Sequence, residues 1–125
     1  MRAKRVSRFE FQLLERLWEL GPSSVREVQE ALPERDRPAY TTVQTMIYRL
    51  EEKGAVRRVK KIGNAHIFEA VLARTTVHKR LVADLLEMFG GSPASVMSCL
   101  VETGKLTLSD VRAIERELSK REKKL

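Results

Sequence analysis

The sequence contains only one cysteine among its 125 residues. A lone thiol forms no internal disulfide and cannot join a cluster of cysteines around zinc or copper. Cys99 lies in the apolar stretch VMSCLVE. Because free cysteine is among the most buried residue types, we expect a buried structural thiol.

Long apolar runs are also missing. No stretch approaches the roughly 18 to 20 apolar residues of a membrane-spanning helix. The opening sequence MRAKRVSRFE lacks the apolar segment that follows the basic start of a signal peptide. The sequence therefore predicts a cytoplasmic protein with no membrane partner.

Residues typical of catalytic and metal sites are scarce. The two histidines, His66 and His78, lie outside any metal-ligand spacing, and we expect structural or solvated roles for both. The sequence has no phosphate-binding loop, no glycine-rich dinucleotide motif and no nucleophile elbow. We therefore expect no catalytic residues, no metal and no cofactor, and hence no enzyme.

Apolar and basic residues are plentiful. A hydrophobic content of 42% can form a real core, and the length suits one domain or a small domain with an appendage. Lysine and arginine outnumber the acidic residues by 24 to 17, which gives a formal charge of +7. This balance favours a polyanionic partner, either nucleic acid or an anionic membrane surface.

The apolar spacing predicts three helices in the first half of the chain. Ser7 and Glu10 form a capping box for the first helix. A serine at position 23 or 24 caps a short second helix. The third helix covers residues 40–53 and ends at Gly54.

After the third helix the apolar period changes. VRRVKK and HIFEAV are predicted to be two short strands, joined by a turn at Gly63-Asn64, although their alternation is imperfect. Three more helices are predicted, and the last dissolves into the basic tail SKREKKL. Their expected ranges are 74–89, 92–104 and 107–118.

The order of elements predicts a mainly α fold of two parts. Residues 1–72 are expected to form a winged helix-turn-helix, and residues 73–125 a three-helix C-terminal dimerisation region. The stretch from Lys53 through Phe68 contains five basic residues and no acidic one. This basic hairpin is the expected wing.

The third helix has two different faces. At about 100° per residue, one arc contains Val43, Met46, Ile47 and Leu50, and a three-helix core would bury it. The other sides carry hydroxyl, amide and arginine groups that can read base edges in a major groove. A merely solvated face is the alternative. We expect base contacts from Thr41, Thr42, Gln44 and Thr45.

The wing is expected beside the neighbouring phosphates. A solvated strand edge is the alternative, since lysine on an exposed strand also prevents unwanted pairing. Contacts with phosphate from the helix and the wing are predicted for Tyr40, Tyr48, Arg49, Arg57, Arg58, Lys60, Lys61 and Asn64.

The C-terminal helices have more apolar surface than a terminal appendage can easily bury within itself. One winged domain contacts few base pairs, so two copies are expected to act together on palindromic DNA. The alternative is that these helices pack back onto the winged domain. The homodimer is predicted to form through Val77, Leu81, Val82, Leu85, Leu86, Phe89, Val96, Met97, Leu100, Ile114 and Leu118.

Three segments that cover most of the chain resemble one known family. They are FQLLERLWELGPSSVREVQEAL, AYTTVQTMIYRLEEKGAVRR and FGGSPASVMSCLVETGKLTLSD. In combination they are similar to the penicillinase and methicillin-resistance repressors, the BlaI/MecI family. The resemblance implies a winged helix that binds double-stranded operator DNA, a helical dimerisation region, and repression that ends when an inducing protease cuts the repressor.

The resemblance also assigns residues. The family's reading helix corresponds to Tyr40 through Arg49. The proteolytic site falls at Cys99-Leu100, where the antibiotic-responsive members have an Asn-Phe pair, and this departure weighs against proteolytic induction. A related branch senses copper through cysteine pairs near its C-terminus. This chain has no cysteine after Cys99, so copper sensing of that kind is not expected.

A rival function keeps the fold and changes the partner. A winged helix can serve as a protein-protein interaction module without specific DNA binding, and its third helix would then have an apolar or acidic outer face. The predicted outer face is neither. The sequence therefore favours a homodimeric, sequence-specific DNA-binding transcriptional repressor that inserts residues 40–53 in the operator major groove.

Overall fold

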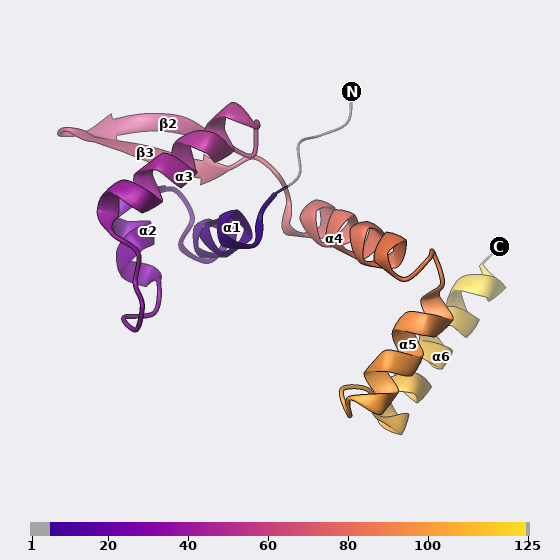
Figure 1. The fold of residues 1–125 in the computed structure, drawn as a ribbon. Helices are drawn as coiled ribbons and strands as arrows, with labels where there is room; N and C mark the ends of the chain where they lie inside the picture. Colours follow the sequence, from indigo (N-terminus) through magenta and orange to yellow (C-terminus); the bar gives the residue numbers. More distant parts are fainter. Residues whose placement is uncertain (1–5, 125) are drawn as a thin grey trace. The chain divides into compact units, whose positions relative to one another are not determined.

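The computed structural model describes residues 6–124 of the chain. They form two compact units, of which the N-terminal one ends at His78 and the C-terminal one begins at Lys79. The described residues contain six α-helices and a sheet of three short strands. Figure 1 labels the helices and the two longer strands, β2 and β3. The predicted mainly α class is confirmed.

Helix α1 (Arg8–Leu20) begins at the predicted capping box. The backbone N–H of Glu10 donates to Ser7 Oγ at 3.2 Å, and the Ser7 N–H donates to Glu10 Oε1 at 2.9 Å. Two donors that have no partner within the helix are satisfied in this way. The helix ends at Gly21, whose φ of 77° is costly for a residue with a side chain.

Helices α2 (Val25–Ala31) and α3 (Tyr40–Glu52) are the helix-turn-helix pair. Ser24 caps α2 through a second capping box. In the loop between the helices, an Arg37 Nη2–H donates to Leu32 O at 2.7 Å. This bond gives a partner to a carbonyl at the end of α2 and fixes the loop that leads into α3.

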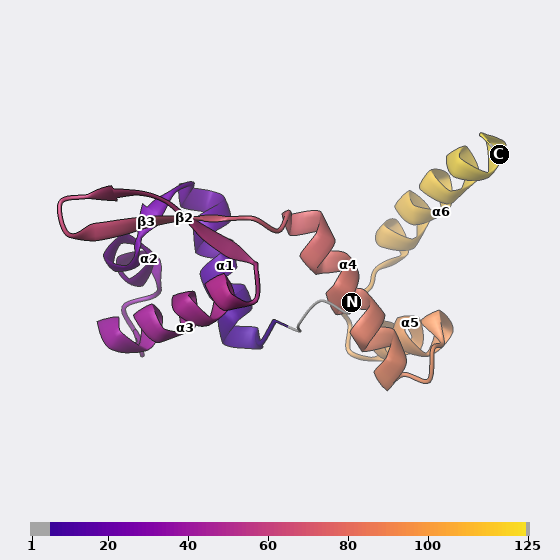
Figure 2. The same ribbon diagram turned by 90° about the horizontal axis from the view of Figure 1, so that it is seen from above.

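The wing is an antiparallel hairpin of β2 (Val56–Ile62) and β3 (Ala65–Ala70). Figure 2 shows the two strands side by side with their turn at the far end. Gly63 lies in this turn with a φ of 59°, as the sequence predicts. The pairing register shifts at Val59, which is an extra, bulged residue. The bulge shifts the alternation of β2 by one residue at this point.

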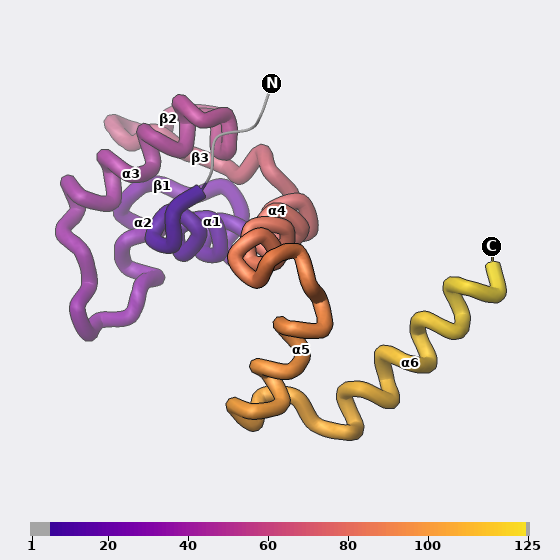
Figure 3. The backbone as a smooth tube through the Cα atoms, turned by 45° about the vertical axis from the view of Figure 1, so that its right-hand side comes forward, coloured from indigo at the N-terminus to yellow at the C-terminus, as the bar shows by residue number. Residues whose placement is uncertain are grey.

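A third strand, which the sequence does not predict, completes the sheet. The two-residue strand β1 (Ser23–Ser24), labelled in Figure 3, pairs with β3, so that the strand order is β1-β3-β2. Ser23 lies opposite Phe68 and Ser24 opposite Ile67. This pairing ties the wing to the start of α2.

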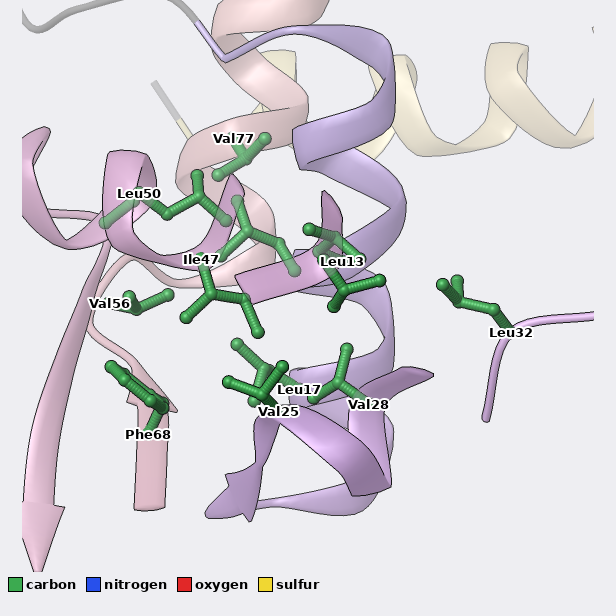
Figure 4. Close-up of a cluster of buried hydrophobic side chains, with 13 residues drawn as sticks. Leu13, Leu17, Val25, Val28, Leu32, Ile47, Leu50, Val56, Phe68 and Val77 are labelled. Atoms are coloured by element: carbon green, nitrogen blue, oxygen red, sulfur yellow. The ribbon is translucent and has the colours of Figure 1, made fainter. Parts of the chain in front are cut away.

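The core of the N-terminal unit receives side chains from α1, α2, α3 and the wing (Figure 4). Each fully buried aliphatic or aromatic side chain contributes about 1.5–3 kcal/mol, so this cluster is the main term that holds α3 in place. Its members are Leu13, Leu14, Leu17, Val25, Val28, Leu32, Val43, Ile47, Leu50, Ala55, Val56, Phe68 and Val77.

The first turn of α4 (Arg74–Met88) contributes to this core. Val77 is only 2% exposed, and the structure therefore corrects the prediction of Val77 as a dimerisation residue. Trp18 Nε1–H donates to Leu72 O at 3.0 Å, and the Arg74 guanidinium carbon lies 5.5 Å from the centroid of the indole ring. These contacts with α1 hold the first turn of α4 against the core. The apolar stripe of α4 is continuous, so the sequence does not show that its first turn differs from the rest of the helix.

The remaining helices are α5 (Pro93–Glu102) and α6 (Leu108–Lys123), which Figure 3 traces one after the other. Neither has a buried residue. Helix α6 extends to Lys123 instead of dissolving into the basic tail. Three basic residues lie in its last turn, where positive charge interacts favourably with the helix dipole.

Candidate nucleic-acid interface

Helix α3 has a buried inner face and an accessible outer face. On the inner face, Val43, Ile47 and Leu50 have no exposed surface, and the predicted inner residue Met46 is half-buried. Among the residues predicted to contact bases, Thr41, Thr42 and Thr45 are exposed and Gln44 is half-buried. Arg49 is exposed as well. The protein's own core therefore leaves these hydroxyl, amide and guanidinium groups accessible to a ligand.

The hydroxyl of Thr45 is partly used within the helix. Thr45 Oγ1 donates to Thr41 O at 2.9 Å. Because a hydroxyl has a single proton, Thr45 can offer an outside partner only its methyl group and an oxygen lone pair. The methyl group suits contact with a thymine methyl.

A cation of α2, which sequence reasoning missed, lies beside the first turn of α3. Ala39 is the N-cap and supplies no side-chain hydrogen bond, so the positive end of the helix dipole has no side-chain acceptor there. The exposed Arg26 of α2 has its guanidinium carbon 5.0 Å from the centroid of the Tyr40 ring. The apolar spacing of α2 does not show that Arg26 reaches α3.

The wing cations differ in their surroundings. Lys60 and Lys61 are exposed, and neither forms an ion pair with the residues between 6 and 124. Arg57 Nε donates instead to Glu69 Oε1 at 2.6 Å. The two lysines are thus the cations of the wing that have no carboxylate partner in the described chain.

Arg58 and Tyr48, both predicted to face phosphate, contact other residues of the protein. Arg58 Nε donates to Glu51 Oε2 at 2.8 Å. Tyr48 is half-buried, and its ring centroid lies 6.2 Å from that of Phe68. Both residues therefore connect α3 to the wing in the free protein.

A recess of about 70 Å³ lies between α3 and the wing. Four residues predicted to bind DNA meet at this recess, namely Tyr40, Gln44, Tyr48 and Asn64. The structure thus brings together residues of α3 and of the wing turn.

A buried ion pair supports the C-terminal end of α3. Lys53 Nζ lies 2.6 Å from Oε1 of Glu10, whose side chain is only 2% exposed. Burial alone would raise the pKa of Glu10, but hydrogen bonds from Lys53 and Ser7, together with the charge of Lys53, hold this pKa below its ordinary value. Lys53 thus anchors α3 to α1.

Most residues predicted for dimerisation are accessible in the single chain. Leu81, Val82, Leu85, Met97, Ile114 and Leu118 have exposed fractions between 39% and 54%. A further group is half-buried and comprises Leu86, Phe89, Val96 and Leu100. Apolar helix faces of soluble proteins are normally covered, so these helices are suited to a partner.

Cys99 is exposed, which corrects the expected buried thiol. Helix α5 has no buried residue, so the apolar sequence around Cys99 marks a surface that lacks a cover in the single chain. The predicted proteolytic bond between Cys99 and the half-buried Leu100 lies within this helix.

Within residues 6–124, no group of three histidine, cysteine, aspartate or glutamate residues is arranged to hold a metal ion. None of the described helices has the length and apolarity needed to cross a membrane. A hollow of about 450 Å³ between α1 and the α2–α3 loop has none of the predicted site residues in its lining.

The helix-turn-helix pair, the accessible face of α3 and the basic hairpin define a protein of the winged helix-turn-helix class. The sequence pattern of the family described as Penicillinase repressor matches residues 6–120. The chain belongs to this family, which confirms the resemblance found in its sequence. It is accordingly a DNA-binding transcriptional regulator and not an enzyme.

Individual proteins show the same relationship. Two relatives named Transcriptional regulator BlaI come from the CDC 1551 / Oshkosh and ATCC 25618 / H37Rv strains of Mycobacterium tuberculosis. Each is 29% identical over 119 residues, which are 94% of this chain and 86% of the relative. A solved MarR family protein from Bacillus stearothermophilus has a TM-score of 0.48 and 19% identity, covering 97% of this chain and 76% of that one.

Proposed function

We propose that the chain is a cytoplasmic, homodimeric repressor that recognises a palindromic operator by inserting α3 into the major groove. The observation that carries this proposal is the division of α3 into a buried face and an outer face of accessible hydroxyl and amide groups. Such groups pair with base edges in a major groove.

The contacts on DNA fall into two classes. Bases are read by the outer residues of α3, which are Thr41, Thr42, Gln44 and Thr45. Backbone phosphates are held by groups that surround this face. One is the half-buried Tyr40, and the others are the exposed residues Arg26, Arg49, Lys60, Lys61 and Asn64. Phosphate contacts fix the position of the protein, and base contacts choose the sequence.

The second subunit supplies the other half of the recognition. A single winged domain reads too few base pairs for a specific site, and the exposed apolar residues of α4, α5 and α6 offer a surface for a second copy. Two-fold symmetry would then place two α3 helices in successive turns of the major groove, about 34 Å apart.

Selection of bound duplexes from a random library by the full chain tests this function. We expect enrichment of an inverted repeat, and binding to it that weakens with salt. About eight phosphate contacts in a dimer would give a log-log slope of roughly −7. Equal affinity for every duplex would contradict sequence-specific repression, and salt-insensitive or absent binding would favour the protein-binding alternative.

Two substitutions separate base reading from phosphate binding. Thr45→Ala should reduce discrimination at one base pair by about 1–3 kcal/mol and leave binding to random DNA unchanged. Lys60→Ala should weaken binding to all duplexes alike and flatten the salt slope by about 0.9 for each subunit, or about 1.8 for the dimer. Fluorescence anisotropy titrations at several salt concentrations measure both effects. If Thr45→Ala lowered the affinity for the selected and the random duplexes equally, Thr45 would not read a base, which would favour nonspecific binding.

A further inference from the structure

A row of four side chains joins the wing to the base-reading face of α3. It starts at Phe68 of β3, which is labelled in Figure 4. The Arg58 guanidinium carbon lies 5.4 Å from the centroid of the Phe68 ring and 4.9 Å from that of the Tyr48 ring. The row ends where Gln44 Nε2 donates to the Tyr48 hydroxyl oxygen at 3.2 Å.

The position of Arg58 depends on the register of the hairpin. Arg58 is paired with Phe68 across the two strands, on the side of the Val59 bulge nearer to α3. Glu51 of α3 accepts a hydrogen bond from Arg58 Nε at 2.8 Å. The guanidinium therefore makes ring contacts and an ion pair at once, which the compact ammonium of lysine would not reproduce.

The hydrogen bond to Tyr48 constrains the amide of Gln44. Nε2 has two N–H donors, and Tyr48 accepts from one of them. The other N–H and Oε1 then remain for an outside partner. An amide that offers one donor beside one acceptor matches N7 and the N6 amino group of adenine.

We propose that Arg58 and Tyr48 are positioning residues, which hold the Gln44 amide in the orientation that reads an adenine in each half-site. This inference rests on the proposed function and extends it. Arg58 fixes the ring of Tyr48, the Tyr48 hydroxyl fixes the amide of Gln44, and neither positioning residue needs to touch DNA. The wing thereby contributes to sequence choice as well as to phosphate binding.

The test uses the full chain and the site that it selects from the random library. Gln44→Ala first identifies the base pair at which Gln44 acts. Tyr48→Phe, which removes only the hydroxyl, and Arg58→Lys, which keeps the charge, should each reduce discrimination at that same base pair by about three- to tenfold. Binding to random duplexes should stay unchanged.

Arg57→Lys is the matched control. It makes the same exchange on the neighbouring residue of β2, whose carboxylate partner Glu69 lies on the wing itself. Discrimination should then stay within about twofold of the wild-type value, since Arg57 is not stacked on the Tyr48 ring. Arg58→Met, which removes the charge, should leave the salt slope unchanged, in contrast to Lys60→Ala.

A measurement without DNA checks the positioning step separately. The side-chain amide NMR signals of Gln44 should shift in Tyr48→Phe and Arg58→Lys and stay in place in Arg57→Lys. Unshifted signals, undiminished discrimination in both variants, or a salt slope of the dimer flattened by about 1.8 in Arg58→Met would each overturn the positioning role alone. A wild-type protein that fails to discriminate would instead refute the proposed function, and the adenine reading with it.

Discussion

Helices α3 and α6 have similar apolar spacing and opposite surroundings. Ile47 and Leu50 of α3 have no exposed surface, whereas Ile114 and Leu118 of α6 are 48% and 54% exposed. An apolar stripe thus predicts that a helix face will be covered, and it does not identify the cover. In α3 the cover is the rest of the unit, and for α6 we propose a second subunit.

The largest expected effect is the loss of core packing in α3. Leu50→Ala should lower the free energy of unfolding by about 2–5 kcal/mol, since it leaves a cavity in a fully buried cluster. Urea denaturation followed by the fluorescence of Trp18, the sole tryptophan, measures this loss. Leu118→Ala is the control and, at a protein concentration below the dissociation constant of the proposed dimer, should change the same transition by less than about 0.5 kcal/mol. Equal losses would remove the contrast between the two helices.

The next effect concerns self-association. Ile114→Asp combined with Leu118→Asp should raise the dissociation constant of the dimer at least 100-fold, or about 2.7 kcal/mol, because two charges would have to enter an apolar contact. Sedimentation equilibrium measures the change. The matched control places the same charges on the opposite side of α6, through Ser109→Asp and Ala113→Asp, and should leave association intact. A wild-type chain that is monomeric at micromolar concentration would contradict the proposed dimer.

Local signals explain why much of the fold could be predicted from the sequence. The capping box of Ser7 and Glu10, the turn at Gly63 and the apolar period of α3 depend on residues a few positions apart. Such patterns act through backbone hydrogen bonds and the repeat of a helix. The strand β1 escaped prediction because two residues are too few to show a period.

Long-range contacts explain what was missed. Val77 belongs to the core because α4 meets α1, and Cys99 is exposed because α5 lacks a cover in the single chain. In the candidate site, the outer face of α3 follows from helical geometry alone. The place of Arg58 depends on the bulge at Val59 and on the pairing with Phe68, and imperfect strand alternation does not specify either of them.

Ion pairs provide a smaller contrast between the two regions. Lys53→Met should lower the free energy of unfolding by about 1–3 kcal/mol, because the buried carboxylate of Glu10 would lose its charged partner. The control Arg121→Met removes the exposed pair with Glu117 in α6, and should cost less than about 0.5 kcal/mol. Urea denaturation at neutral pH measures both values. Similar costs would show that burial does not set the strength of these pairs.

The same pair gives a dependence on pH. Since the folded protein holds the pKa of Glu10 below its ordinary value of 4.5, the stability from this group is present above that value and is lost as the pH falls through the lowered pKa. Unfolding free energies measured from pH 6 to pH 2 should therefore fall more steeply in the wild type than in Glu10→Gln. Parallel curves would exclude the contribution of Glu10.

The smallest effect compares two capping boxes of the same chemistry. Ser7→Ala should lower the free energy of the Trp18 transition by about 1 kcal/mol, since α1 lies in the core. Thr107→Ala should leave that transition unchanged, because α6 has no buried residue. Its effect should appear locally: hydrogen bonds from the Thr107 backbone and side chain lower the pKa of Asp110, so removal of the hydroxyl should raise this pKa toward its ordinary value in an NMR titration. A Trp18 transition weakened as much by Thr107→Ala as by Ser7→Ala would mean that α6 unfolds together with the core of the winged helix.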